Sequence, residues 1–306
     1  MSLRSSATAR GVAAPLTAGA FLAGTMLLGS PAFAADTTVD FQNACHARAI
    51  LPQDISNPFG FTIDAPEAAA VGQEVSYTLQ PAPGSLPDKE SIATTTDLQR
   101  LKLDIDVPAN AELVTAELLA GTGKGLGGTA PSVTRIDADG NPDQAGQYLR
   151  ISGGNETVGN GPNSSADTAG GISVPKTKTD LAGNPTADGS TQFQLPAVRV
   201  TVKPVAEGVI TPRVRTAGDA GTYDNEANYY TFLARAQAFG SNFNAPSFCI
   251  PKDGTKPASD TPFNAGGKAL ATITVGKGGN PDPDPEPEPG TGGSSGLGSL
   301  GETFGS

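Results

Sequence analysis

The sequence predicts an all-β fold, an immunoglobulin-like antiparallel β-sandwich with long loop insertions. The chain contains 39 glycines and 26 prolines among 306 residues, a composition typical of short strands separated by turns. Residues 101–107 alternate between apolar and charged side chains, which indicates a strand with one face in the core and the other in solvent. Strands do not alternate with helical patterns along the chain, so the sheets are expected to be antiparallel.

The strands are expected, in order, at 37–43, 60–64, 74–80, 101–107, 113–119, 133–137, 147–152, 172–174, 191–203, 209–215, 230–238 and 269–275. In the strand 101–107, we expect the charged side chains to face water, namely Lys102, Asp104 and Asp106. Asp139-Gly140 predicts a hairpin turn between 133–137 and 147–152. Pro196 should bend the strand 191–203 or place it at a sheet edge. Residues 153–190 are poor in large apolar side chains and form a long insertion.

Both ends of the chain differ from the folded part. Arg4 and Arg10, the apolar stretch 11–29 and Ala32-Phe33-Ala34 together predict a signal peptide over 1–34, cleaved before Ala35. The alternative, a membrane helix, is disfavoured because the uninterrupted apolar part is shorter than the roughly 20 residues of a span. We therefore expect no integral membrane segment and a secreted protein, extracellular or associated with the cell envelope. Residues 35–276 should form one large sandwich or two closely packed ones.

Residues 277–306 should be a disordered tail, rich in Pro, Asp and Glu and then in Gly and Ser. Its alternation of proline with acidic residues favours an extended conformation. A spacer through a cell wall is the functional alternative to a disordered end.

Charge and cysteine content limit the chemistry. The net charge of −11 disfavours nucleic acid and anionic lipid as partners. Cys45 and Cys249 are the only cysteines, and in a secreted chain such a pair predicts one disulfide. His46 is the only histidine, which argues against a Ser-His-Asp hydrolase and a His-based zinc site. We expect no cofactor.

Two sequence stretches resemble known bacterial families. Gly72-Gln73-Glu74-Val75-Ser76-Tyr77-Thr78-Leu79, together with 101–111, resembles the core of immunoglobulin-like modules of bacterial surface proteins. Residues 195–198 and Phe248-Cys249-Ile250-Pro251 resemble secreted actinobacterial envelope domains of unknown function, in which two distant cysteines bracket a sandwich. The resemblance implies a β-sandwich fold and an envelope location, and it carries no catalytic residue.

Two polar clusters are candidate sites. The first places an oxygen ligand at every second position, as calcium loops do: Asp137, Asp139, Asn141 and Asp143. Its glycine is fourth and not sixth, and the twelfth position has no glutamate, so an acidic hairpin turn is the competing interpretation. The second cluster consists of Asp219, Asp224, Asn225, Glu226 and Asn228.

Seven aromatic residues lie between 223 and 248. Tyr223, Tyr229 and Phe243 have Asn or Gly nearby and are the candidate binding residues on an exposed aromatic strip. Core packing is the competing explanation.

Together these observations predict a secreted, non-catalytic cell-envelope protein that acts by surface binding or in a structural role. A cell-wall component or a surface protein is the expected partner. One alternative is a lipid or glycan carrier that uses an apolar cavity or the aromatic strip. A second is a carboxylate-dependent glycoside hydrolase, because the 31 acidic residues offer many carboxylate pairs.

Overall fold

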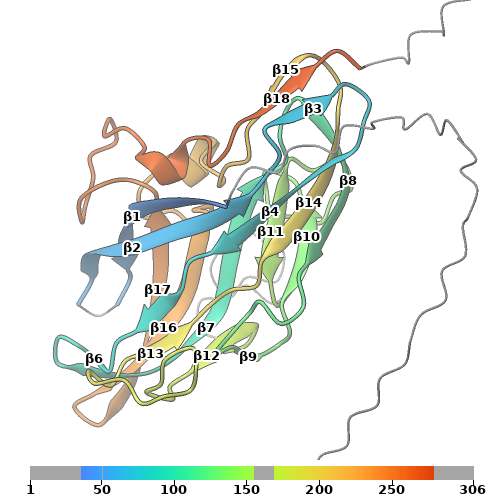
Figure 1. The fold of residues 1–306 in the computed structure, drawn as a ribbon. Coiled ribbons are helices and arrows are strands. Elements are labelled where there is room, and N and C mark those ends of the chain that lie inside the picture. Colours follow the sequence, from blue (N-terminus) through green and yellow to red (C-terminus); the bar gives the residue numbers. More distant parts are fainter. Residues whose placement is uncertain (1–35, 50, 155–168, 279–306) are drawn as a thin grey trace, which may run out of the picture. The chain divides into compact units, whose positions relative to one another are not determined.

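The computed structural model describes residues 36–49, 51–154 and 169–278 (Figure 1). The regular elements of these residues are β-strands and two short 3-10 turns, η1 (Gly218–Gly221) and η2 (Ala265–Gly267), with no α-helix among them. The expected all-β fold with antiparallel pairing is confirmed, although the pairing of residues 274–276 with residues 68–70 is parallel. The predicted signal peptide, most of the tail and residues 155–168 of the long insertion lie outside the described residues.

The strands form one large sheet and two small ones. The large sheet runs, in spatial order, through β10 (Ser132–Ile136), β11 (Tyr148–Ser152), β7 (Ala93–Asp106), β16 (Tyr230–Ala238), β17 (Ser241–Ile250), β1 (Thr37–Ala47), β2 (Gln53–Asp64), β4 (Val75–Pro81), β14 (Val198–Pro204) and β8 (Ala111–Leu118). Attached to it are β6 (Lys89–Glu90), β9 (Gly127–Gly128) and β12 (Ile172–Pro175). The small sheets are β13 (Thr191–Phe193) with β5 (Gly84–Leu86), and β15 (Gly208–Ile210) with β18 (Ile273–Gly276) and β3 (Ala68–Ala70).

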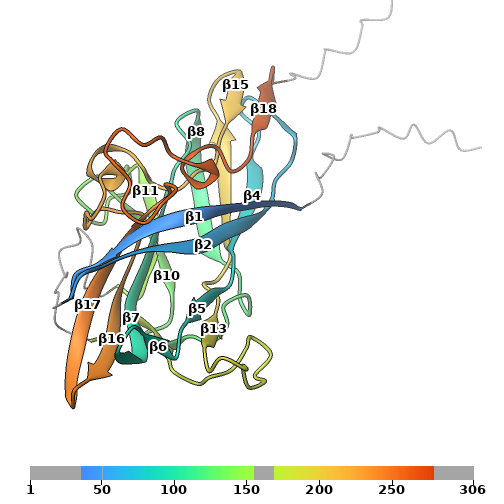
Figure 2. The same ribbon diagram turned by 90° about the vertical axis from the view of Figure 1, so that its left-hand side faces the viewer.

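The large sheet folds over a single core. Leu79 of β4 and Val200 of β14 belong to the same buried cluster as Leu103 of β7 and Ile151 of β11. The two ends of the sheet, β8 and β10, approach one another. The long β1–β2 hairpin crosses between the two halves (Figure 2). The sandwich is therefore one continuous hydrogen-bonded sheet that wraps around its core.

The disulfide joins two neighbouring strands of this sheet. Cys45 of β1 pairs directly with Cys249 of β17 in the antiparallel register, and the two sulfurs are bonded. The two cysteines are 204 residues apart in the chain. The bond therefore ties the first strand to a late one.

The charged face of β7 is not exposed, contrary to the expectation for Lys102 and Asp104. Both side chains are completely buried. Residues 215–229, here called the excursion loop, leave the edge of β7 after Val214, which bridges to Ile105. The chain returns at Tyr230, which pairs with Leu103. Because this loop covers the outer face of β7, the alternating pattern here marks a strand that is buried on both faces.

Other elements differ in detail from the sequence-based expectation. The hairpin across Asp139-Gly140 is confirmed as β10–β11. The expected strand 191–203 is divided into β13 and β14, with Pro196 between them. β14 is a central strand between β4 and β8, so the proline ends one strand instead of marking an edge.

Candidate functional site

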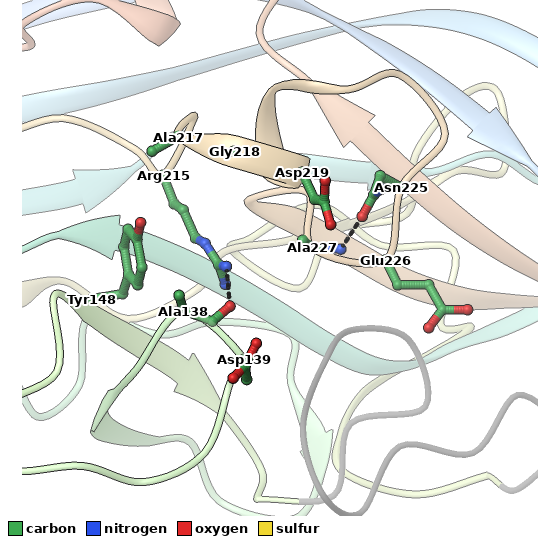
Figure 3. Close-up of a pocket in the computed structure, with 10 residues that line it drawn as sticks. All are labelled: Ala138, Asp139, Tyr148, Arg215, Ala217, Gly218, Asp219, Asn225, Glu226 and Ala227. Atoms are coloured by element: carbon green, nitrogen blue, oxygen red, sulfur yellow. Dashed lines mark hydrogen bonds between the residues drawn. The ribbon is translucent and has the colours of Figure 1, made fainter.

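The candidate site is a pocket between the β10–β11 turn and the excursion loop (Figure 3). Its volume is about 520 Å³. The lining residues are Ala138, Asp139, Tyr148, Arg215, Ala217, Gly218, Asp219, Asn225, Glu226 and Ala227. The pocket thus combines members of both polar clusters that the sequence indicated. We call it the excursion pocket.

A buried ion network anchors the pocket to the sheet. The carboxylate of Asp104 accepts two hydrogen bonds from Arg150, each 2.8 Å long, and a third of 3.3 Å from Nη1 of Arg215. Nζ of Lys102 lies 3.6 Å from the same carboxylate. One buried carboxylate therefore serves three buried cations from β7, β11 and the start of the excursion loop.

The environment shifts the pKa values of the two β7 residues in this network. Burial lowers the pKa of Lys102 to about 7, against the attraction of Asp104. Burial acts to raise the pKa of Asp104, but the charges of Arg150 and Lys102 outweigh it and lower this pKa to about 2. Lys102 also donates a 3.1 Å hydrogen bond to the carbonyl of Glu226. The network thereby positions one wall of the pocket.

Arg215 joins the opposite wall to the same network. Its guanidinium stacks 4.3 Å from the ring centroid of Tyr148. Nη2 donates a 2.6 Å hydrogen bond to the carbonyl of Ala138 in the β10–β11 turn. The other charged residues that line the pocket are Asp139, Asp219 and Glu226, here called the rim carboxylates. Such a rim suits positively charged or hydrogen-bond-donating groups.

The first polar cluster is built as a turn. Oδ1 of Asp137 accepts hydrogen bonds from the backbone amides of Asp139 and Asn141, at 2.9 and 2.8 Å. These bonds, with that to Asn141 the largest cause, lower the pKa of Asp137. Oδ1 of Asp143 accepts the amide of Ala145.

A second turn has the same geometry. Asp180 accepts the amides of Ala182 and Asn184 at 2.9 and 2.8 Å, within a matching Asp-x-x-Gly-Asn-Pro sequence. That turn has Ala182 where the first has Asp139, and Thr186 where it has Asp143. The conformation therefore does not need the extra carboxylates, which favours the hairpin-turn interpretation over calcium. The described residues contain no group of three or more metal-ligating side chains placed to hold an ion.

His46, the only histidine, lies beside the part of the excursion loop that is away from the pocket. Nδ1 of His46 lies 2.6 Å from Oδ1 of Asp54, and the hydroxyl of Tyr223 donates a 2.6 Å hydrogen bond to the same oxygen. The bond from Tyr223, followed by that from His46, lowers the pKa of Asp54. Arg48 donates a 2.8 Å hydrogen bond to Asp224. These contacts fasten the loop to the β1–β2 hairpin beside the disulfide.

The three predicted aromatic residues do not form one exposed strip. Tyr229 is completely buried and donates a 2.7 Å hydrogen bond to the buried side chain of Asn43, so the expectation that it is exposed was wrong. It is the last residue before β16, and its ring lies edge-on to that of Phe59, with the ring centroids 6.0 Å apart. Tyr223 is half-buried and tied to Asp54, and Phe243 is half-buried in β17 opposite Ala236.

Comparison with known proteins gives a distant structural similarity. No protein-family model and no curated protein matches the chain. A crystal structure of a Corynebacterium diphtheriae protein described as membrane anchored is similar with a TM-score of 0.40 and 13% identity, over 79% of this chain and 38% of that one. The C-terminal domain of the Streptococcus pyogenes antigen I/II-family protein AspA is similar with a TM-score of 0.25 and 13% identity, over 60% of this chain and 41% of that one. The chain spans about two fifths of the length of each, and neither similarity assigns a role to any of its residues.

In the part of the chain that the structure describes, no helix is long and apolar enough to cross a membrane.

Proposed function

We propose that this is a secreted, non-catalytic protein of the bacterial cell envelope, and that it holds a cell-wall component or a surface protein in the excursion pocket. In this proposal the mature chain begins at Ala35, a single domain covers 35–276 and residues 277–306 form the tail. The signal-peptide pattern and the Cys45–Cys249 disulfide support folding outside the cytoplasm.

The observation that carries the proposal is the way the excursion loop is held. Binding residues usually lie on loops that a rigid scaffold positions. The loop is held from two directions. On the side of the sheet it rests on the buried network of Asp104, Lys102 and Arg150, and at the β1–β2 hairpin it contacts His46 and Arg48. A pocket that is braced in this way loses little conformational entropy when a partner binds.

The surroundings favour surface binding over a lipid carrier. The excursion pocket is lined mainly by charged and polar residues, whereas a lipid carrier needs a predominantly apolar cavity. The clustered aromatic rings, among them Phe59, Phe61 and Tyr230, pack on one another in and against the core.

The proposal is tested by binding purified mature protein to envelopes isolated from the producing bacterium. The double variant Asp139→Asn/Asp219→Asn removes two rim carboxylates, and we expect at least a tenfold loss of binding. The matched control, Glu74→Gln/Glu207→Gln, removes two exposed carboxylates elsewhere and should bind as the wild type does. Equal binding by all three proteins would contradict the proposal. Release of soluble saccharide that a single rim substitution abolishes would establish the hydrolase instead.

A further inference from the structure

We propose that the free edge of β1 binds an extended, basic peptide segment of another protein, which adds to the large sheet as a further strand. β1 pairs with β2 along its whole length, but with β17 only over residues 44–47. β17 ends at Ile250, so residues 37–43 have no partner strand on that side among the described residues. This edge shares no lining residue with the excursion pocket, and the proposal does not depend on that pocket.

The backbone groups of alternate residues point toward this free edge. In an antiparallel ladder, successive residues direct their N–H and C=O groups to opposite sides of the strand. The carbonyl of Gln42 accepts a 2.7 Å hydrogen bond from Nδ2 of Asn264, in the segment after β17, and its partner in β2 is Pro58, which has no N–H. Gln42 therefore faces the free edge, and so do Asp40 and Thr38. In the part of the chain that the structure describes, nothing on this side bonds to the backbone of Asp40 or Thr38.

A groove of about 410 Å³ lies at this edge. Asp40 and Gln42 of β1 line one side of it, and Asp253 and Asn264 of the segment after β17 line the other. In Figures 1 and 2 this orange segment, which contains η2, lies beside β1. Gly266 of η2 holds it close to the strand, because a Cβ there would lie 2.3 Å from the ring of Phe41. The groove is thus a preformed space beside unpaired backbone groups.

An extended peptide matches this edge better than a small molecule does. Unpaired N–H and C=O groups that recur at every second residue are matched by the main chain of another strand, which is how peptides add to sheet edges. Edge strands are commonly protected by proline, lysine or a bulge. Residues 37–42 contain neither proline nor lysine, and their pairing with β2 runs without a register shift. Half-buried Phe59 also lines the groove and offers a contact for an apolar side chain.

The charge of the groove favours a basic peptide. The charged residues of the two segments that form it, 36–43 and 251–268, are four acids and three lysines: Asp36, Asp40, Asp253, Asp260, Lys252, Lys256 and Lys268. Lys252 is buried and donates a hydrogen bond to the carbonyl of Ser259, and Lys256 lies 3.6 Å from Asp54. Lys268 alone then opposes the four carboxylates. Asp40, the charged residue on the edge itself, makes no ion pair within the described residues, so it favours a lysine or arginine opposite it and disfavours an acidic strand.

Amide hydrogen exchange, followed by NMR on the mature protein, tests the edge directly. The probe is a seven-residue peptide that alternates lysine with valine and is blocked at both ends. We expect the amides of Asp40 and Gln42 to exchange rapidly in the free protein and at least tenfold more slowly with the peptide. The amides of Phe41 and Asn43 point to β2 and should exchange slowly in both states. The same peptide with every lysine N-methylated on its backbone keeps its charge but loses the paired N–H groups, and it should bind at least tenfold more weakly.

Two variants separate backbone pairing from charge. Asp40→Pro removes an N–H at the free edge and no bond to β2, and it should weaken peptide binding at least tenfold. The matched control Asp40→Ala keeps that N–H and should weaken binding no more than about threefold, the effect of one exposed charge. Circular dichroism verifies the fold, and if Asp40→Pro does not fold, the N-methylated peptide decides with the wild-type protein.

Four results would overturn the proposal. They are no binding of the unmodified peptide, equal binding of the N-methylated one, equal losses in the two variants, and slow exchange of the Asp40 amide in the free protein. If that exchange slows only as the protein concentration rises, the occupant of the edge is a second copy of the chain.

Discussion

Replacing Asp104 with asparagine should be among the most destabilising single substitutions in this protein. The side chain is completely buried and accepts hydrogen bonds from Arg150 and Arg215, with Lys102 3.6 Å away. Asparagine has a similar shape but no charge, so the variant removes the buried negative charge that Arg150, Arg215 and Lys102 share. Breaking one buried ion pair from one side costs about 3–5 kcal/mol. We expect a loss of about 4 kcal/mol, which is a large part of the roughly 5–15 kcal/mol that a domain has.

The loss is measured by urea unfolding. With an m-value of about 3 kcal/mol/M, the midpoint should fall by about 1.3 M. The control is Glu117→Gln, which also turns an acid into its amide but breaks an exposed pair with Arg199. Exposed pairs contribute about 0.5 kcal/mol or less. If the free energies of unfolding of Asp104→Asn and of this control differ by less than 1 kcal/mol, the buried network does not anchor the excursion loop as we infer.

Three further predictions concern stability. Reducing the Cys45–Cys249 bond should lower the free energy of unfolding by up to about 5 kcal/mol, because the unfolded chain regains the entropy lost by closing a loop of 204 residues. Urea titrations with and without reductant measure this change, and a change below 1 kcal/mol would contradict the prediction. Burial raises the pKa of Asp106 to about 7, so the folded protein holds a proton that the unfolded chain releases above about pH 4. The free energy of unfolding should therefore fall as the pH rises from about 4 to 7, and Asp106→Asn should make this decrease smaller. The same decrease in the variant and the wild type would show that the carboxyl is solvated. Phe239→Asn should stabilise the β16–β17 hairpin by about 0.5–1 kcal/mol, because asparagine tolerates positive φ; a lower melting temperature would show that Phe239 packs in the fold.

The sequence predicts much of the strand content, because period-two patterns and turn residues are local signals. It does not predict which face of a strand is covered. Lys102 and Asp104 have the alternation of a solvent-facing strand, yet they are buried by the excursion loop, which follows more than 100 residues later in the chain. A strictly local pattern cannot report such a long-range contact.

The candidate site was only partly predictable for the same reason. The two polar clusters are visible in the sequence, but only the fold brings Asp139 and Asp219 into one pocket. The polar neighbours of Tyr229 in the sequence indicate an exposed side chain. In the fold its hydroxyl is buried and hydrogen-bonded to Asn43, which is 186 residues away in the chain. The repeat Asp-x-x-Gly-Asn-Pro at 137 and 180 is a local signal that reveals both turns once the two copies are compared.

The central claim, that the excursion pocket receives an envelope partner, is tested most directly by hydrogen exchange of the mature protein with and without isolated envelopes. We predict increased protection of backbone amides in 215–228 and in 137–146, because these segments line or adjoin the pocket. Amides in β8 and β15 should exchange at unchanged rates. Protection confined to other segments, with the excursion loop unchanged, would contradict the account.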